Sequence, residues 1–378
     1  MLDTLLADCV RLDASDLHLA PGQAPFFRIQ GVLGHQPGAA ALTKEHIDGL
    51  VDQLLRGFDR SGLERNGTGS VDGALSARDN TRFRFNVFRR QNAMGIALRK
   101  LEDRFRGLAE LGMPEHLYQL CDLPDGLVVV CGPTGSGKST TLATMLDRIN
   151  RSRRCHMITI EDPIEYIHPP ALSLVSQRQV GADAGSFNDA VVASLRQDPD
   201  VILVGEIRDL GTIRTAITAA ETGHLVFTTV HAGDCVGAIE RLVSVFPADE
   251  QNGIRRQLAL VLKAVIAQHL LVTDGPAAAP PNGETGGRRR RVVTSEVLMV
   301  TPAVANLIAT AKGAQIYSSM ETGAAQGMQT LEQDLARLWV GNWISESAAM
   351  SMARNPNILR DRAAMLRKPP GRPVGGMR

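Results

Sequence analysis

The sequence lacks an excess of charge of either sign. Its 41 lysine and arginine residues nearly balance 40 aspartate and glutamate residues, so the formal net charge is +1 over 378 residues. Proteins that coat nucleic acid usually carry a large basic excess. The balance therefore argues against nucleic acid as a partner.

Long apolar runs and paired cysteines are also missing. No apolar run reaches the roughly 18 residues that a membrane-spanning helix needs, and the acidic amino-terminal segment MLDTLLADCVRLDASD is unlike a signal peptide. The five cysteines are scattered, odd in number and without any C-x-x-C spacing. Such cysteines favour free thiols in a reducing cytosol over disulfides or a zinc site. We therefore expect a cytosolic α/β protein.

Residues 1–105 have the pattern of a small α+β domain. Apolar residues at helical spacing predict two helices, near residues 2–10 and 43–55, the second with Thr43 as its N-cap. Alternating apolar and polar residues around 16–33 and 82–101 predict strands. A linker is expected over 106–116, where Gly107, Gly112 and Pro114 lie.

Residues 117–300 show a different pattern. Apolar runs at 126–133, 155–162, 201–206 and 224–231 alternate with helical stretches, which indicates a largely parallel sheet with helical crossovers. Residues 273–291 are rich in Gly, Pro and Ala and end in four arginines, and we expect a solvated hairpin tip there in preference to a nucleic-acid patch. Residues 301–366 are predicted to be helical and 367–378 disordered.

The segment GPTGSGKST follows the first of these strands and precedes a helix. It fits the pattern G-x-x-x-x-G-K-[ST], in which glycines turn main-chain N–H groups towards phosphates at the start of a helix. The lysine then reaches the β- and γ-phosphates, and the serine hydroxyl can bind Mg²⁺. The predicted nucleotide-binding residues are Gly132, Pro133, Thr134, Gly135, Ser136, Gly137, Lys138, Ser139 and Thr140.

Carboxylates follow two other predicted strands. ITIEDPIEY places Glu161, Asp162 and Glu165 after an apolar run, and VILVGEIRD does the same with Glu206. The carboxyl ends of strands are where such sheets bind ligands. Phosphoryl transfer to water needs a metal clamp and an oriented water, and carboxylates serve both tasks. His224 and His231 bracket the strand between them, so both strand ends are candidates to face the nucleotide.

Four motifs together resemble those of the secretion ATPase superfamily, which includes type II secretion and type IV pilus motors. The phosphate loop is followed by ITIEDPIEY, similar to the family's Asp box, then LRQDPDVILVGEIRD, similar to its Walker B signature. AAETGHLVFTTVHAGD is similar to the His box, and SDLHLAPGQAPFFRIQG to the start of the family's PAS-like domain. The resemblance implies a RecA-like P-loop ATPase core, a smaller PAS-like α+β domain before it and a helical carboxy-terminal region.

The resemblance is stronger to the PilT-like retraction branch than to the assembly motors. Assembly motors carry extra amino-terminal domains and a four-cysteine zinc module, neither of which is found in this sequence. One segment departs from the branch: residues 303–310, AVANLIAT, keep the apolar frame of its retraction motif but lack the charged residues. An accessory ATP-binding pilus regulator with weak turnover therefore stays open beside a retraction motor.

The resemblance also implies roles for individual residues. Glu206 would be the Walker B glutamate that supports the metal and its water shell, and Lys138 and Ser139 would serve phosphate and Mg²⁺. Glu165 would be the general base, and His231 would contact the γ-phosphate region. The segment reaching across to a nucleotide would supply arginine fingers, for which the candidates are Arg82, Arg84 and Arg99; a solvated strand face is the alternative explanation for the first two.

The resemblance implies, finally, how the protein would work in the cell. It predicts a homohexamer that hydrolyses ATP to drive pilus retraction and twitching motility. The hexamer would be cytoplasmic, at the inner-membrane face of the pilus machine, with a platform protein as its partner and a paralogous pilus ATPase as a further candidate. A related type IV secretion or conjugation ATPase is the alternative, and a RecA-type DNA helicase fits the neutral charge least.

Overall fold

The computed structural model describes residues 1–29, 31–58, 60–64, 69–101, 104–207, 209–274 and 291–367. Arg208, most of the predicted 273–291 loop and all but the first residue of the predicted 367–378 tail lie outside this set. The chain divides into two compact units, one of residues 1–105 and 146–219 and the other of residues 106–145 and 220–378. In the described part of the chain, no helix has the length and apolar character of a membrane span.

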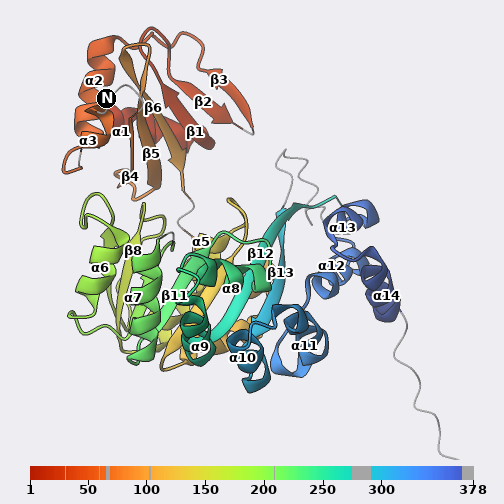
Figure 1. The fold of residues 1–378 in the computed structure, drawn as a ribbon. Coiled ribbons are helices and arrows are strands. Elements are labelled where there is room, and N and C mark those ends of the chain that lie inside the picture. The colour runs from red at the N-terminus through yellow and green to blue at the C-terminus, as the bar shows by residue number, and fades with distance from the viewer. Residues whose placement is uncertain are drawn as a thin grey trace, which may run out of the picture. The chain divides into compact units, whose positions relative to one another are not determined.

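A six-stranded antiparallel sheet occupies the amino-terminal part of the first unit, with strand order β3-β2-β1-β6-β5-β4 (Figure 1). The strands predicted from alternation are all present. Inward-facing residues such as Phe83, Phe85 and Val87, spaced by two, are fully buried. The strands are β1 Ala14–Leu19, β2 Phe26–Ile29, β3 Val32–His35, β4 Ser70–Ser76, β5 Arg82–Arg90 and β6 Ala93–Lys100.

Three helices accompany this sheet: α1 Leu2–Arg11, α2 Lys44–Leu54 and the short α3 Ser61–Glu64. The predicted N-cap of α2 is confirmed, since the Thr43 hydroxyl accepts a hydrogen bond from the His46 N–H at 3.2 Å. The His46 ring in turn accepts from the Thr43 N–H at 3.3 Å. The apolar side chains of α1 and α2 belong to the same hydrophobic core as the inner face of the sheet.

A second sheet has seven strands in the order β13-β12-β7-β11-β10-β8-β9. β7, β11, β12 and β13 belong to the second unit, and β8, β9 and β10 to the first. The four predicted strands are confirmed as β7, β8, β10 and β11, while β9, β12 and β13 are additional. Their bounds are β7 Gly126–Cys131, β8 His156–Glu161, β9 Leu174–Gln179, β10 Val201–Val204, β11 Leu225–Val230, β12 Leu262–Val272 and β13 Arg291–Met299.

The pairing is largely parallel, as expected. β7 pairs in parallel with β11 and β12, and β8 with β9 and β10. β12 and β13 are antiparallel. Every residue of β7, β10 and β11 is buried, which explains why these strands are continuous apolar runs in the sequence.

Helices connect these strands. The predicted linker 106–116 contains the short helix α4, whose C-cap Gly112 has φ of 80°, and the first residues of a 3₁₀ helix that starts at Glu115. The domain boundaries predicted from the sequence stay predictions. The connecting helices are α4 Leu108–Leu111, the 3₁₀ helix Glu115–Asp122, α5 Lys138–Ser152, α6 Phe187–Ser194, α7 Leu210–Glu221, α8 Cys235–Ser244 and α9 Gln251–Val261.

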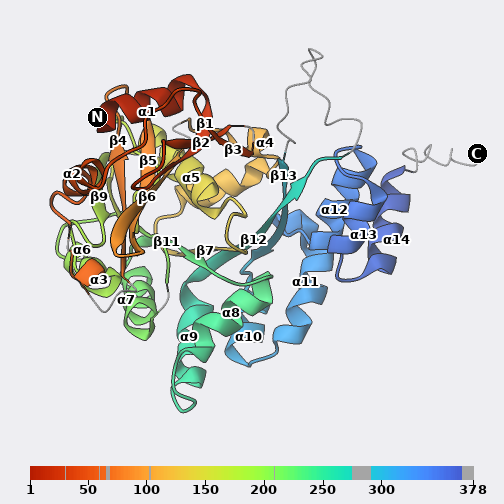
Figure 2. The same cartoon turned by 90° about the horizontal axis from the view of Figure 1, so that it is seen from above.

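The carboxy-terminal region is helical, with α12, α13 and α14 grouped together (Figure 2). The divergent segment 303–310 lies almost entirely in α10, where Val304 and Ile308 are buried and Thr301 is the N-cap. Its apolar frame therefore packs inward without the charged residues. The helices are α10 Pro302–Ala309, α11 Ile316–Thr322, α12 Leu331–Val340, α13 Glu346–Met352 and α14 Pro356–Arg367, with 3₁₀ turns at Gly313–Gln315 and Gly323–Gln326.

Candidate nucleotide site

The phosphate loop connects the buried strand β7, which ends at Cys131, to the helix α5, which begins at Lys138. Gly132, Gly135 and Gly137 have φ of 149°, 77° and 95°, a region that favours glycine. A Cβ at Gly132 would also lie 2.3 Å from the Gln268 carbonyl oxygen on β12. The glycines thus let the loop turn tightly against a neighbouring strand and lead into the positive end of a helix.

Lys138 is held over this loop. Its Nζ donates hydrogen bonds to the carbonyl oxygens of Gly132 at 2.9 Å and Pro133 at 3.0 Å. Ser139 follows on the first turn of α5, with its side chain exposed. An ammonium group above a glycine-rich helix start fits a polyphosphate, and an accessible hydroxyl beside it fits a hard cation such as Mg²⁺.

His231 lies at the same edge as the phosphate loop. β11 is parallel to β7 with Val230 opposite Cys131, so the exposed His231 and the loop both follow the carboxyl ends of neighbouring strands. His224 lies at the opposite end, where its carbonyl oxygen accepts a hydrogen bond from the Gly126 N–H at 3.1 Å. Of the two histidines, only His231 is therefore placed at the edge that carries the loop.

In the first unit, the acidic residues share an edge of the sheet. β8 and β10 are parallel, with Ile160 opposite Val204; Glu161 is the last residue of β8, and Glu206 lies two residues beyond the end of β10. The Gly205 N–H donates to the Ile160 carbonyl oxygen at 2.8 Å, and a Cβ on Gly205 would lie only 3.0 Å from that oxygen. The close approach to β8 thus explains why a glycine directly follows β10 and the carboxylate of Glu206 comes one residue later.

The Glu161 carboxylate is partly buried and accepts hydrogen bonds from neighbouring side chains, and its role in binding a ligand stays a prediction. Its Oε1 accepts hydrogen bonds from Thr159 Oγ1 at 2.7 Å and Gln177 Nε2 at 3.3 Å. Burial raises the pKa of the Glu161 carboxyl from 4.5 to about 7, while these bonds and one from the Glu165 N–H oppose the shift. Glu165 itself is partly buried, as is Glu206.

The three candidate arginines have different surroundings. Arg82 is buried and donates from Nη2 to the Ile164 carbonyl oxygen at 2.9 Å, next to Glu165. Arg84 and Arg99 lie opposite each other on β5 and β6. Their guanidinium groups lie 3.7 Å from Asp72 and 2.8 Å from Asp16, respectively. The alternative explanation, in which Arg82 and Arg84 line one solvated strand face, is therefore wrong. Arg82 is buried, whereas the Arg84 side chain is partly exposed.

The predicted residues thus fall into two groups, each gathered within one unit. Lys138, Ser139 and His231 belong to the second unit, and Glu165 and Glu206 to the first. Their catalytic roles stay predictions. Among the described residues, no three His, Cys, Asp or Glu side chains cluster so as to hold a metal ion by themselves.

Two buried polar residues near the loop were not predicted. Gln268 on β12 is fully buried, and within the described part of the chain neither atom of its amide has a hydrogen-bond partner. Glu296 on β13 is buried as well. Both occur inside apolar runs, AVIAQHLLV and VVTSEVLMV. Burying a polar side chain in a strand costs free energy unless it is hydrogen-bonded. The two polar residues within apolar runs were therefore the feature of the sequence that could have predicted them.

Comparisons with known proteins show the family to which the chain belongs. Residues 1–339 match the family model described as type II/IV secretion system protein. The chain is 41% identical to the type IV pilus retraction ATPase PilT of Pseudomonas aeruginosa, over 93% of this chain and 98% of that protein. It is 37% identical to the type IV pilus ATPase PilU of the same organism, over 95% and 90%. A crystal structure of the pilus retraction motor PilT with bound ADP has a TM-score of 0.83 and 39% identity, over 95% and 99%.

Proposed function

Because this chain belongs to the type II/IV secretion system protein family, we propose that it is an ATP-hydrolysing motor that drives retraction of a type IV pilus. The observation that carries the proposal is the 41% identity with a pilus retraction ATPase along almost the whole of both chains. The expected superfamily, the RecA-like ATPase core and the assignment as an ATPase are confirmed.

In this proposal the phosphate loop binds ATP. The Lys138 ammonium exchanges the carbonyl oxygens of Gly132 and Pro133 for phosphate oxygens. Ser139 and Glu206 would hold Mg²⁺, the second partly through water, and the ion would neutralise phosphate charge. Glu165 polarises the attacking water and His231 contacts the γ-phosphate region. The loop geometry and the family membership support these roles.

The arginines supply positive charge for the transition state in this proposal. An arginine finger is worth about 10³ to 10⁵ in rate. Arg84 and Arg99 would have to exchange Asp72 and Asp16 for phosphate oxygens. The Arg84–Asp72 pair is about half exposed on both sides, so breaking it costs little. Asp16 is buried, so releasing Arg99 would leave a buried carboxylate with Arg28 at 3.7 Å as its remaining ion-pair partner and would cost more. Motion of the amino-terminal domain would therefore free Arg84 more readily than Arg99.

Assembly and location complete the proposal. We infer a homohexamer in the cytoplasm, peripheral to the inner membrane, that acts on a pilus platform protein. PilU supports the further proposal of a paralogous partner, since Pseudomonas aeruginosa has PilT and PilU, both similar to this chain.

Two alternatives differ in measurable ways. A type IV secretion or conjugation ATPase would share the family model, but its loss would stop export and leave pili unchanged. A regulator that binds ATP with little turnover is favoured by the absence of charge in the divergent segment, whose apolar residues are buried in α10. Steady-state hydrolysis by the purified protein distinguishes this regulator from a motor.

The test of the proposed ATPase chemistry is a pair of substitutions. Lys138→Ala should abolish turnover, because it removes the charge over the phosphates. Glu165→Gln should slow steady-state hydrolysis by at least about 10²-fold while leaving the affinity for a fluorescent ATP analogue nearly unchanged. Hydrolysis by Glu165→Gln at the wild-type rate would show that the base has been wrongly assigned.

A further inference from the structure

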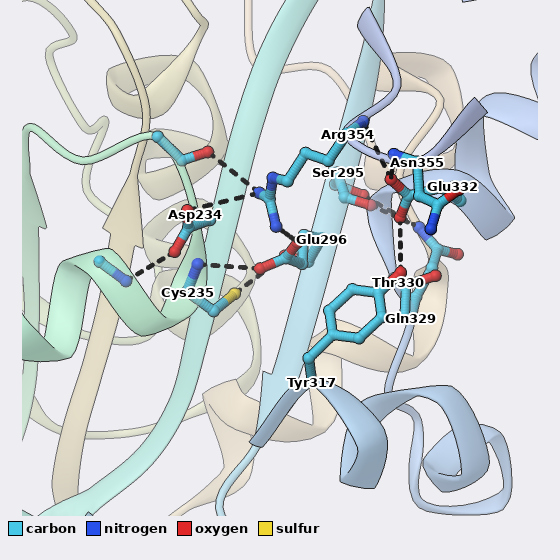
Figure 3. A network of polar contacts seen from close by, with 12 residues as sticks. Asp234, Cys235, Ser295, Glu296, Tyr317, Gln329, Thr330, Glu332, Arg354 and Asn355 are labelled. Carbon is cyan, nitrogen blue, oxygen red and sulfur yellow. Dashed lines mark hydrogen bonds and ion pairs between the residues drawn. The ribbon is translucent and has the colours of Figure 1, made fainter. Parts of the chain in front are cut away.

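A chain of polar contacts in the second unit joins the carboxy-terminal helices to the turn that follows His231 (Figure 3). Arg354, between α13 and α14, forms an ion pair with Glu296, Nη1 to Oε2, at 2.8 Å. Its Nη2 donates to the Gly233 carbonyl oxygen at 3.3 Å and lies 3.8 Å from Asp234 Oδ2. One guanidinium therefore contacts both the 231–235 turn and strand β13.

Glu296 binds the same turn from the other side. Its Oε1 accepts a hydrogen bond from the N–H of Cys235, the first residue of α8, at 2.9 Å. The Glu296 side chain is only 3% exposed. A buried ion pair contributes little to stability, because desolvation offsets the attraction, and apolar replacements are often neutral or stabilising. A buried carboxylate in this apolar strand therefore favours a role in fixing geometry.

The main chain at Arg354 is anchored to the helices. Oε1 of Glu332, on α12, accepts hydrogen bonds from the N–H groups of Arg354 and Asn355, both at 3.1 Å. Its Oε2 accepts from the Tyr317 hydroxyl of α11 at 2.8 Å. Glu332 is fully buried. The position of Arg354 is thus set by α11 and α12, while its side chain reaches the turn.

Further hydrogen bonds hold the 231–235 turn against the end of β7. The Asp234 side chain caps α8 by accepting from the Gly237 N–H at 2.6 Å. The Cys131 thiol donates to the Asp234 carbonyl oxygen at 3.5 Å, and Cys131 directly precedes the phosphate loop. The Gly233 carbonyl oxygen also contacts His269 Nε2 of β12 at 3.1 Å. A shift of the 231–235 turn would therefore displace residues next to the phosphate loop.

We propose that Arg354 is a positioning residue for ATP hydrolysis, which fixes the 231–235 turn, and with it His231, to the carboxy-terminal helices. The inference rests on the proposed function, in which His231 contacts the γ-phosphate region. It also gives the helices a route to the nucleotide site: movement of α11 or α12 pulls on the turn through Glu332 and Arg354.

The test compares Arg354→Gln with Arg362→Gln, a matched control whose guanidinium lies near Glu321 at 3.8 Å, on a different contact. Arg354→Gln should lower kcat at least ~10-fold, since small misplacements of catalytic groups are costly, with the affinity for a fluorescent ATP analogue within about two-fold of wild type. Arg354→Lys should restore part of kcat. Equal kcat for the two glutamine variants would overturn the proposal.

A double-mutant cycle shows whether Arg354 acts through the turn. In a His231→Ala background, Arg354→Gln should lower kcat by less than about two-fold, because the group it positions is gone. A loss as large as in the wild-type background would contradict the proposal.

Hydrogen exchange of the 231–237 amides separates this inference from the proposed function. Faster exchange there in Arg354→Gln, but not in Arg362→Gln, would support the proposal that Arg354 fixes the 231–235 turn. This would hold even if the wild-type protein hydrolysed no ATP, a result that would contradict the proposed function alone. Unchanged exchange in Arg354→Gln would overturn the positioning role of Arg354. If Arg354→Gln does not fold, the uncharged pair Glu296→Gln with Arg354→Gln replaces it in the same comparison.

Discussion

At the scale of single residues, Glu161 shows how burial and hydrogen bonding compete. Three donors favour its ionised form, yet burial dominates and raises its pKa to about 7. Its neighbours are Thr159 and Gln177, both in the first unit. The sequence placed Glu161 correctly at a strand end, but the direction of its side chain depends on Gln177 of β9, a strand that was not predicted.

The raised pKa predicts how stability depends on pH. Between pH 4.5 and about 7 the unfolded chain loses the Glu161 proton while the folded protein keeps it, so the free energy of unfolding falls as pH rises. The loss is complete above pH 7 and is on the order of 3 kcal/mol at most. Glu161→Gln removes it.

The measurement is the midpoint of thermal unfolding from pH 5 to pH 8. The midpoint of Glu161→Gln should rise relative to that of wild type across this range, whereas exposed Glu346→Gln should keep a constant difference. A constant difference for Glu161→Gln as well would show that the carboxyl is already ionised at pH 5.

Two glycines of the phosphate loop form a second residue-scale comparison. A Cβ at Gly132 would meet the Gln268 carbonyl oxygen at 2.3 Å, whereas nothing lies within 4 Å of one at Gly135. Gly132→Ala should therefore weaken binding of a fluorescent ATP analogue by at least ~10-fold. Gly135→Ala carries only the strain of its positive φ, about 1–2 kcal/mol, and should bind better than Gly132→Ala. The reverse order would contradict the loop geometry.

At the scale of elements, strands were predicted correctly where burial of both faces made the sequence continuously apolar. β7, β10 and β11 are fully buried and therefore appear as continuous apolar runs. β9 was missed because its sequence, LVSQRQ, is polar and mostly half-buried. β12 and β13 were not predicted; between them the sequence analysis expected only a hairpin tip over 273–291, most of which lies outside the described residues.

The N-cap of α2 is an element whose stability can be tested directly. Thr43→Ala removes the acceptor for the His46 N–H and should destabilise the protein by about 1 kcal/mol. Thr43→Ser keeps the hydroxyl and should stay close to wild type. Denaturant unfolding followed by circular dichroism measures both; equal stability of the two variants would show that the cap contributes nothing.

At the scale of the whole molecule, the motifs identified the family, but the contacts between distant segments could not be predicted. Lys138, Glu206 and His231 could be predicted because their motifs are contiguous in the sequence. The polar network of the carboxy-terminal helices joins positions up to 120 residues apart in the sequence, and no local pattern links them. Its members are Asp234, Glu296, Glu332 and Arg354. The same limit applies to Arg82, whose burial depends on a partner at Ile164.

The central claim is that the chain retracts a type IV pilus, and deletion of its gene in the host tests it most directly. Surface pili should increase in number while twitching motility is lost, since filaments would still assemble but no longer be withdrawn. The wild-type gene should restore both properties, and the Lys138→Ala gene neither. Cells without pili would contradict the claim, because they would show that the motor acts in assembly.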